Sequence, residues 1–486
     1  KHTLLLEGGD DAVRYGIDFQ YNNVAGVMKG SSREVISVGF NMQYRYKSLI
    51  FSEQLSVTFN KAKESPYGTF SEYAKLNPYW RAYNDDGSVK EILGDYEKAN
   101  FQGTKPIYNP LTNADINTKN ESTYTDVTNN FYIEWLAFQG MRLKGRLGII
   151  SKKDDSEIFY PRDHTMFKDV DPDSEEYFER GSYTMGNGKR FEYNADLSAN
   201  YSRDFGKHVV FANGQWSFSE RKYNYVEFKA RGFANDKMDY ITHAKEYAEG
   251  GPTGSESLSR EASFLISTNY SYDNRYLLDA NIRMDGASVF GSNKHYTETW
   301  AVGLAWNLHN ESFLREVDWI GMIKFRASIG NPGNQNFSAY KAYTTYVYNT
   351  NLQNAFGMGA NVSGFGNPDL KWQKTMDYNL GLDLTVLNNR LKINTDVYWK
   401  DTDPMLVTTS IASSTGRDSY ITNLGAQRTK GVSFNVVGTV MSKAEDRLNW
   451  SFSLNGRHQK QTYRNIGAGL ELLNDELKST SLTRYR

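Results

Sequence analysis

The sequence predicts an all-β fold, a transmembrane antiparallel β-barrel, and three observations support this prediction. Hydrophobic and polar residues alternate with a period of two in many segments. The connections between these segments are alternately short and long, and aromatic residues, 14% of the chain, gather beside the short ones. Because successive side chains of a strand point to opposite faces, each segment has one apolar and one polar face. Outer-membrane barrels combine such strands with short turns at one end and long loops at the other.

The composition of the chain excludes several classes of function. The chain has 56 Lys and Arg against 57 Asp and Glu, a formal charge of −1, so it lacks the field of a general nucleic-acid binder. It contains no Cys, which removes disulfide scaffolds, thiolate metal sites and cysteine nucleophiles. No stretch approaches the ~18 apolar residues of a membrane-spanning helix.

The alternation is clearest in residues 33–46, where Ile36, Val38 and Phe40 face one side and Ser37 and Asn41 face the other. The same pattern recurs along the chain and predicts about sixteen strands. No long amphipathic helix is evident, and a short one is considered at residues 311–317. The predicted strands span residues 2–8, 13–24, 33–46, 49–61, 127–139, 141–152, 189–203, 208–221, 259–272, 276–286, 296–308, 320–330, 374–387, 390–401, 427–441 and 448–460.

Alternating short and long connections place every second connection on the same side of one sheet, which favours a barrel with long extracellular loops. Residues 1–486 are therefore interpreted as one partial barrel. Parity places the first strand on a descent from outside, so an earlier strand is expected, and the C-terminal end is expected to be incomplete. The long loops are predicted at residues 62–126, 153–188, 222–258, 331–373 and 402–426.

Two soluble folds compete with the barrel. A β-propeller would give a repeat of about 40–50 residues with a recurring signature, and none is found. A β-sandwich would not alternate its loop lengths so regularly. Aromatic residues beside the predicted short turns, such as Tyr44, Tyr46, Tyr272 and Tyr276, favour the barrel because a lipid–water boundary attracts amphipathic rings.

Five segments, in chain order, resemble motifs of the SusC-like TonB-dependent outer-membrane transporters. They cover the later part of the chain, and each alone is a weak signal. The family's Glu is replaced by Gln373, and Pro404, Met405, Thr429 and Ser433 also depart from its motifs. The segments are residues 283–291 (RMDGASVFG), 325–335 (FRASIGNPGNQ), 367–374 (NPDLKWQK), 398–406 (YWKDTDPML) and 423–431 (NLGAQRTKG).

The resemblance implies a barrel of about 22 strands around a plugged lumen. The N-terminal plug and the TonB-contacting segment of the family are not found in this sequence. The resemblance further implies TonB-dependent import of a large nutrient across the outer membrane with a SusD-like lipoprotein. An oligosaccharide is favoured over an oligopeptide. The rival interpretation is a passive porin, or a structural or secretion-associated barrel.

Charged residues on the polar faces are expected to face the lumen or the plug. They carry both signs, whereas a channel for ions of one sign would be lined by one sign. An ion pair between strands, or between barrel and plug, is the simpler interpretation for each of them. The lumen- or plug-facing candidates are Arg283, Asp285, Arg326, Lys324, Arg142 and Arg146.

The loop at residues 62–126 is the strongest candidate for ligand contact, because it is rich in aromatic residues. Aromatic faces can stack on sugar rings while neighbouring polar groups bind hydroxyls. The alternative is that these rings pack the loop or contact the lipoprotein. The predicted substrate-binding residues are Trp80, which is the first choice, and Tyr79, Tyr83, Arg81, Tyr73 and Tyr108.

Asp169, Asp171 and Asp173 stand at alternate positions of a loop, a spacing that can gather Ca²⁺. The Gly and Glu of the helical calcium loop are lacking, so a solvated acidic loop is the stronger interpretation and no cofactor is expected. Nor is an enzyme expected. The histidines are scattered, and neither H-E-x-x-H, G-x-S-x-G nor a phosphate-binding loop occurs.

Overall fold

The computed structural model describes residues 1–97, 104–248, 251–289, 295–334, 343–371, 373–417, 419–443 and 448–465. The described chain falls into two compact units. Unit 1 comprises Lys1–Ile133, Arg146–Asn194 and Glu220–Leu258, and unit 2 comprises Glu134–Gly145, Ala195–Ser219 and the chain from Ser259. Among the described residues, no helix combines the length and the apolar character needed to cross a membrane.

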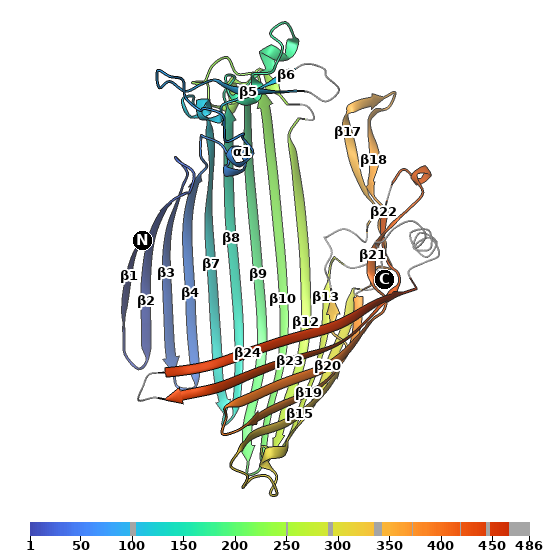
Figure 1. Cartoon of the computed structure of the whole chain (residues 1–486). Coiled ribbons are helices and arrows are strands. Elements are labelled where there is room, and N and C mark those ends of the chain that lie inside the picture. Colours follow the sequence, from blue (N-terminus) through green and yellow to red (C-terminus); the bar gives the residue numbers. More distant parts are fainter. Residues whose placement is uncertain are drawn as a thin grey trace. The chain divides into compact units, whose positions relative to one another are not determined.

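Unit 1 begins with a four-stranded antiparallel meander, in which each strand pairs with the next (Figure 1). Asp10 shapes its first turn, because its Oδ1 atom accepts hydrogen bonds from the backbone N–H groups of Ala12 and Val13. The strands are β1 (His2–Gly9), β2 (Val13–Ala25), β3 (Ser32–Tyr46) and β4 (Leu49–Lys63).

Four long strands follow, and each contributes to both units. They are β7 (Lys119–Phe138), β8 (Met141–Tyr160), β9 (Ser182–Phe205) and β10 (His208–Arg231). They exceed the predicted spans, chiefly at the ends joined to the long loops. Smaller elements lie between them: α1 (Phe70–Ala74), the hairpin of β5 (Ile92–Glu97) and β6 (Thr104–Tyr108), and β11 (Glu246–Tyr247).

In unit 2, eight strands pair one after another in an antiparallel meander. They are β12 (Thr253–Tyr272), β13 (Tyr276–Ala287), β14 (Tyr296–Asn307), β15 (Ile320–Gly330), β19 (Gln373–Val386), β20 (Leu391–Thr402), β23 (Ala426–Lys443) and β24 (Leu448–Arg464). The first of them, β12, begins within unit 1. Short strands lie in the loops: β16 (Gly333–Asn334), the hairpin of β17 (Thr345–Asn354) and β18 (Gly357–Gly364), and the hairpin of β21 (Leu406–Ser410) and β22 (Ser419–Asn423).

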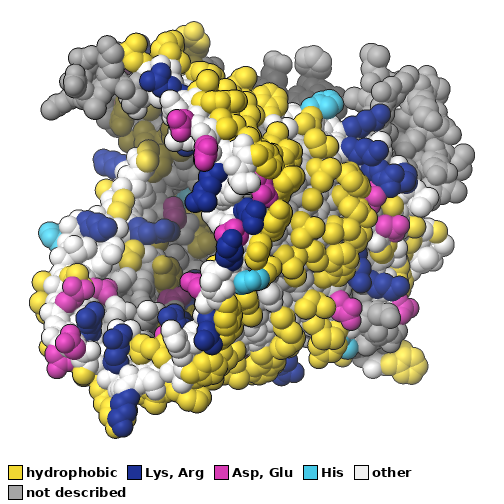
Figure 2. All heavy atoms as spheres, turned by 90° about the horizontal axis from the view of Figure 1, so that it is seen from below, with side chains coloured by type: hydrophobic (Ala, Val, Ile, Leu, Met, Phe, Trp, Pro, Cys, Tyr) yellow, Lys and Arg dark blue, Asp and Glu magenta, His cyan; other side chains and the backbone are white. Residues whose placement is uncertain are grey.

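The strand register aligns apolar residues into continuous rows. Leu304 of β14 pairs with Leu278, and on β19 and β20 Leu380 pairs with Val397. These side chains are not covered by protein: Leu304 is 57% exposed and Leu380 is 54% exposed. In the meander of unit 1, Leu4 pairs with Phe19 in the same way, and both are exposed. Hydrophobic side chains accordingly spread over broad surface areas in Figure 2.

The described residues form only one hydrophobic cluster with a buried centre, and it lies near the long loops of unit 1. Phe159, Tyr183 and Phe233 are its fully or almost fully buried members. Phe159 and Phe233 meet edge to face, with ring centroids 5.1 Å apart. The exposed apolar strand faces are what a membrane barrel requires, because lipid covers them.

Each predicted strand span overlaps a strand of the structure, so the predicted all-β fold is confirmed. The short helix considered at residues 311–317 is wrong. The chain forms the 3₁₀ turn Leu308–Asn310 and further turns there, with Leu314 N–H bonded to the Glu311 carbonyl. The motif residues Phe290, Gly291, Gln335 and Trp372 lie outside the described residues.

Candidate functional site

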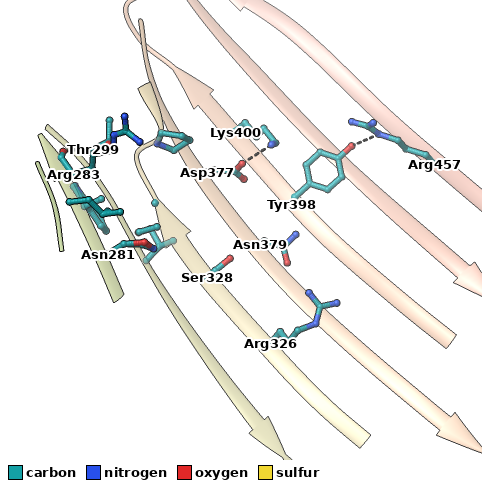
Figure 3. A pocket seen from close by; sticks show the side chains of 16 residues that line it. Asn281, Arg283, Thr299, Arg326, Ser328, Asp377, Asn379, Tyr398, Lys400 and Arg457 are labelled. Atoms are coloured by element: carbon teal, nitrogen blue, oxygen red, sulfur yellow. Dashed lines mark hydrogen bonds and ion pairs between the residues drawn. The ribbon is translucent and has the colours of Figure 1, made fainter. Parts of the chain in front are cut away.

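The polar faces of seven neighbouring strands form one continuous surface in unit 2, because cross-strand partners share a face: β13, β14, β15, β19, β20, β23 and β24. A hollow of about 620 Å³ lies on this polar surface. Figure 3 shows the labelled side chains that line it. They are Asn281, Arg283, Thr299, Arg326, Ser328, Asp377, Asn379, Tyr398, Lys400 and Arg457.

Arg326 is the centre of an ion-pair network on this surface. Its Nε and one terminal nitrogen donate to the two Asp383 oxygens at 2.8 and 2.9 Å, and its other terminal nitrogen lies 3.1 Å from Asp396. The guanidinium lies across Gly381, where an added Cβ would come within 2.6 Å of it. The glycine therefore leaves the space in which Arg326 reaches both carboxylates.

A second group joins β20 to β24. Tyr398 is 8% exposed and lies over Gly431, where an added Cβ would approach the phenol to 2.4 Å. The Arg457 Nε donates to the Tyr398 hydroxyl at 2.8 Å, and another Arg457 nitrogen donates to Gln459 at 2.7 Å. Nearby, Lys400 and Asp377 form an ion pair of 2.6 Å. The polar surface thus presents amide, hydroxyl and guanidinium groups held in place by their neighbours.

The structure shows where the predicted lumen- or plug-facing residues lie. Arg283 and Lys324 share the polar surface with Arg326, and Arg283 pairs with Asp285 on its own strand at 2.7 Å. Arg142 of β8 lies 3.3 Å from Glu134 of β7, and Arg146 lies on the same face of β8 as Arg142 by alternation. Their contact with a plug stays a prediction.

The apolar faces carry aromatic rings beside the short turns. The ring centroids of Tyr276 and Trp306 are 6.5 Å apart, and those of Trp306 and Phe325 are 6.4 Å apart. Glu311, in the turn between β14 and β15, accepts hydrogen bonds from Trp306 Nε1, the Tyr276 hydroxyl and Arg275. These donors hold the pKa of Glu311 below its usual value. These hydrogen bonds connect the turn between β14 and β15 to the row of aromatic rings.

Three of the six predicted substrate-binding residues are engaged within the loops. The Trp80 indole lies against Gly94, where an added Cβ would come within 2.7 Å of it. The Tyr73 hydroxyl donates to the Tyr67 carbonyl at 2.7 Å, and burial raises the pKa of Tyr73 to about 12. The Tyr108 hydroxyl lies 3.4 Å from the Lys168 carbonyl.

The other three are open to solvent. Tyr79 is 92% exposed and Tyr83 is 55% exposed. Arg81 forms an exposed pair with Asp85 at 3.4 Å. The six residues therefore divide into a packed set and an exposed set, and Tyr79 and Tyr83 are the rings with free faces. Ligand contact by any of them stays a prediction.

The acidic segment does not gather its carboxylates. Asp169 pairs with Lys105 at 2.7 Å, and Asp171 accepts from the backbone N–H of Asp173. In the part of the chain that the structure describes, no group of three or more His, Cys, Asp or Glu side chains is arranged to hold a metal ion. Calcium binding thus stays a prediction without geometric support.

The packing of Tyr398 and Arg457 was missed at the sequence level. The sequence identifies Tyr398 only as part of a motif, and it gives no motif signal for Arg457. The alternation in β24 places Arg457 with Asn455 and Gln459 on the polar face, so the face on which Arg457 lies can be predicted from the sequence. Its contact with Tyr398 cannot be predicted in this way, because the strand register decides which residues meet.

Comparisons with known proteins agree with this geometry. The family described as TonB dependent receptor-like, beta-barrel matches residues 37–480. TonB-dependent receptor P26 of Formosa agariphila is 25% identical over 99% of this chain and 47% of its own length. TonB-dependent receptor SusC of Bacteroides thetaiotaomicron is 30% identical over 207 residues, 41% of this chain and 20% of its own length.

Among solved structures, the RagAB peptide transporter gives a TM-score of 0.78 at 21% identity and covers 96% of this chain and 51% of that chain. The ferric citrate transporter FecA gives a TM-score of 0.52 at 7% identity, over 96% of this chain and 57% of that chain. At these identities the likeness is one of fold. The chain spans about half the length, or less, of the curated relatives it matches.

Proposed function

We propose that this chain, which belongs to the TonB dependent receptor-like β-barrel family, forms the wall and the loops of an importer for large nutrients. It is a SusC-like member and lies in the bacterial outer membrane, as its relatives and its fold indicate. The family is one of transporters, and no catalytic family is indicated. Import by the whole protein would be energised through TonB, acting on a plug segment of the family.

The observation that carries the proposal is the strand wall with two different faces. One face of β13–β20 carries apolar rows, in which Leu304 and Leu380 are exposed. The other face carries the hollow whose lining includes Asn, Ser, Arg and Lys side chains. A wall that is apolar toward lipid and polar toward a lumen suits the passage of a hydrophilic solute.

The proposed substrate is an oligosaccharide, with an oligopeptide as the alternative. Exposed tyrosines in the loop of residues 62–126 support a sugar, because their faces are free to stack. The printed name of the RagAB peptide transporter supports considering peptides. The proposed partner is a SusD-like surface lipoprotein that meets the long loops, in keeping with the SusC-like relatives.

Uptake by cells carrying the full-length protein tests this function. We expect saturable accumulation of labelled oligosaccharide that disappears when TonB is deleted. Uptake that persists without TonB would instead identify a passive porin. Deleting a lipoprotein encoded beside the gene is expected to lower uptake at low substrate concentration.

Substitutions in the loop then test the ligand-contact residues. Trp80→Ala is expected to weaken uptake without lowering barrel abundance, but it also removes the indole that packs on Gly94. Tyr79→Ala is the cleaner variant because Tyr79 is 92% exposed and its loss leaves no cavity. Phe70→Ala, also at an exposed aromatic residue of this loop, is the control. Unchanged uptake kinetics of both the Tyr79 and the Trp80 variants would remove this loop from the substrate path.

A further inference from the structure

A second hollow, in unit 1, has a composition that points to a charged ligand. It measures about 560 Å³ and lies on the polar faces of β7, β8, β9 and β10, which are neighbours in the sheet (Figure 1). Its lining includes Tyr124, Lys152, Asp154, Arg190, Arg221 and Tyr223. Each of these residues belongs to unit 1, so the hollow is formed within one compact unit.

Lys152 is a half-buried cation of this hollow that lies over an aromatic ring. Its ammonium lies 4.4 Å from the centroid of the Tyr124 ring. Among the residues that the structure describes, no carboxylate lies within ion-pair distance of Lys152. A cation over an aromatic face keeps most of its hydrogen-bonding capacity, because the ring accepts no strong hydrogen bond. Lys152 can therefore bind an incoming anion without breaking an existing ion pair.

The neighbouring arginines share one carboxylate. Glu192 is 7% exposed, and its Oε2 accepts from Arg190 at 2.5 Å and from Arg221 at 2.8 Å. The Nε of Arg190 is buried and has no hydrogen-bond partner. The group contains three cations, Lys152, Arg190 and Arg221. It contains two carboxylates, Glu192 and Asp154. Asp155, which also lines the hollow, is paired with Lys153 at 3.0 Å. The hollow thus keeps a surplus of one positive charge.

Tyrosine rings flank these cations on both sides. Tyr124 comes from β7, and Tyr223 from β10 lies parallel to Tyr225, with centroids 6.5 Å apart and an interplanar angle of 8°. The Tyr225 hydroxyl donates a hydrogen bond to the Glu227 carboxylate at 2.8 Å. Rings beside cations suit a ligand that has a C–H-rich face and a carboxylate on the same unit. A neutral sugar would use the rings but leave the positive charge without a partner.

We propose that this hollow is a subsite for a carboxylate-bearing sugar unit, such as a uronate, within an oligosaccharide. The uronate carboxylate binds Lys152, with Arg190 and Arg221 adding positive charge beside it, and the sugar ring packs on Tyr124 or Tyr223. This assignment rests on the proposed import of oligosaccharides and narrows it to acidic ones. Glu192 holds Arg190 and Arg221 in place from behind.

Binding to the purified full-length protein tests the subsite. The probes are a hexamer of galacturonic acid and the same hexamer with its carboxylates methyl-esterified, measured by isothermal titration calorimetry at constant salt. We expect the acid to bind at least about tenfold more tightly than the ester. Lys152→Gln is expected to remove most of this difference and to leave ester binding unchanged. Lys392→Gln, on the polar face of β20 outside this lining, is the matched control.

Three results would overturn the subsite. One is equal binding of acid and ester, another is an acid affinity that Lys152→Gln does not change, and the third is no binding of either hexamer. A hexamer of glutamate that binds in a Lys152-dependent manner, in place of the galacturonate, would overturn the sugar assignment. None of these results bears on TonB-dependent uptake, which is measured in cells with the unaltered transporter. Loss of the subsite and loss of the import function are therefore separate outcomes.

Discussion

The loop cluster of unit 1 and the strand wall of unit 2 use hydrophobic residues in opposite ways. In the cluster, Phe159 and Tyr183 are completely buried against Phe233, as in a soluble domain. In the wall, Leu304 and Leu380 are more than half exposed. The difference follows from the solvent: loops stand in water and must exclude it, whereas the strands bury their apolar rows in acyl chains. The same substitution is therefore expected to have different effects in the two regions.

The two regions also differ in how they use charge. Some ion pairs in the loops join segments far apart in sequence, as between Lys105 and Asp169 or Lys168 and Glu91. Several of those on the wall join neighbouring strands, as between Lys400 and Asp377. Exposed pairs of the first kind contribute little each. Packing of the aromatic cluster must therefore supply most of the stability of the loops.

Phe159→Ala should give the largest effect. Removing a fully buried ring is expected to cost about 3–5 kcal/mol and to open the loops around the cluster. Hydrogen exchange in the full-length protein would show lost protection at residues 159–167 and 233–244, with the strand wall unchanged. Phe178→Ala is the control, because Phe178 lies in the loop that follows β8 but is 71% exposed. Equal exchange in both variants would contradict a dry cluster.

Leu304→Arg tests the apolar face of the strand wall. A charge on the lipid face is expected to cost up to about 2–4 kcal/mol, the value for the bilayer midplane. Urea unfolding of the full-length protein from lipid vesicles measures this. Ser328→Arg is the matched control, since Ser328 lies on the polar face of the neighbouring strand and should be tolerated. If the two variants unfold alike, the assignment of the faces is wrong.

The strands could be predicted from the sequence because alternation is a local signal. The polar face shared by Arg283, Lys324 and Arg326 followed directly from it. The loop structure could not be predicted in this way. The hairpins β5–β6 and β17–β18 lie in segments without sustained alternation, and the side-chain environment of Trp80 depends on Gly94, fourteen positions later. Such contacts are set by tertiary packing, which single-residue preferences do not encode.

Gly381→Ala tests the ion-pair network of the wall. The new methyl group would lie 2.6–2.8 Å from the Arg326 guanidinium, so Arg326 must move and lose contact with Asp383 or Asp396. We expect a loss of about 1–3 kcal/mol in vesicle unfolding. Gly303→Ala, on the same face, is the control, because its methyl group would meet neighbours only at 3.8 Å. A destabilisation of the same size in both would show that strand backbone freedom, not Arg326, is responsible.

Acidification should weaken the loop cluster but not the strand wall. Burial lowers the pKa of His164 to about 4, and its neutral Nδ1 accepts the backbone N–H of Met166 at 3.2 Å. An unfolded histidine titrates near 6.5, so between these values the unfolded loop binds more protons than the folded one. The contribution of neutral His164 to the stability of the folded loop is therefore complete above about pH 6.5. This contribution is lost as the pH falls toward 4. The linkage gives a loss of about 2 kcal/mol at pH 5.

Hydrogen exchange at pH 7 and pH 5, corrected for the intrinsic pH dependence, would measure this loss at the turn of Thr165–Phe167. His164→Asn is the informative variant, because an amide oxygen can still accept the Met166 N–H but does not titrate in this range. We expect it to flatten the pH dependence while strand protection stays constant in both proteins. A pH dependence that survives in His164→Asn would place the titrating group elsewhere in the loops. A loss of protection in β13–β15 at pH 5 would show that the loops and the wall do not respond to acid independently.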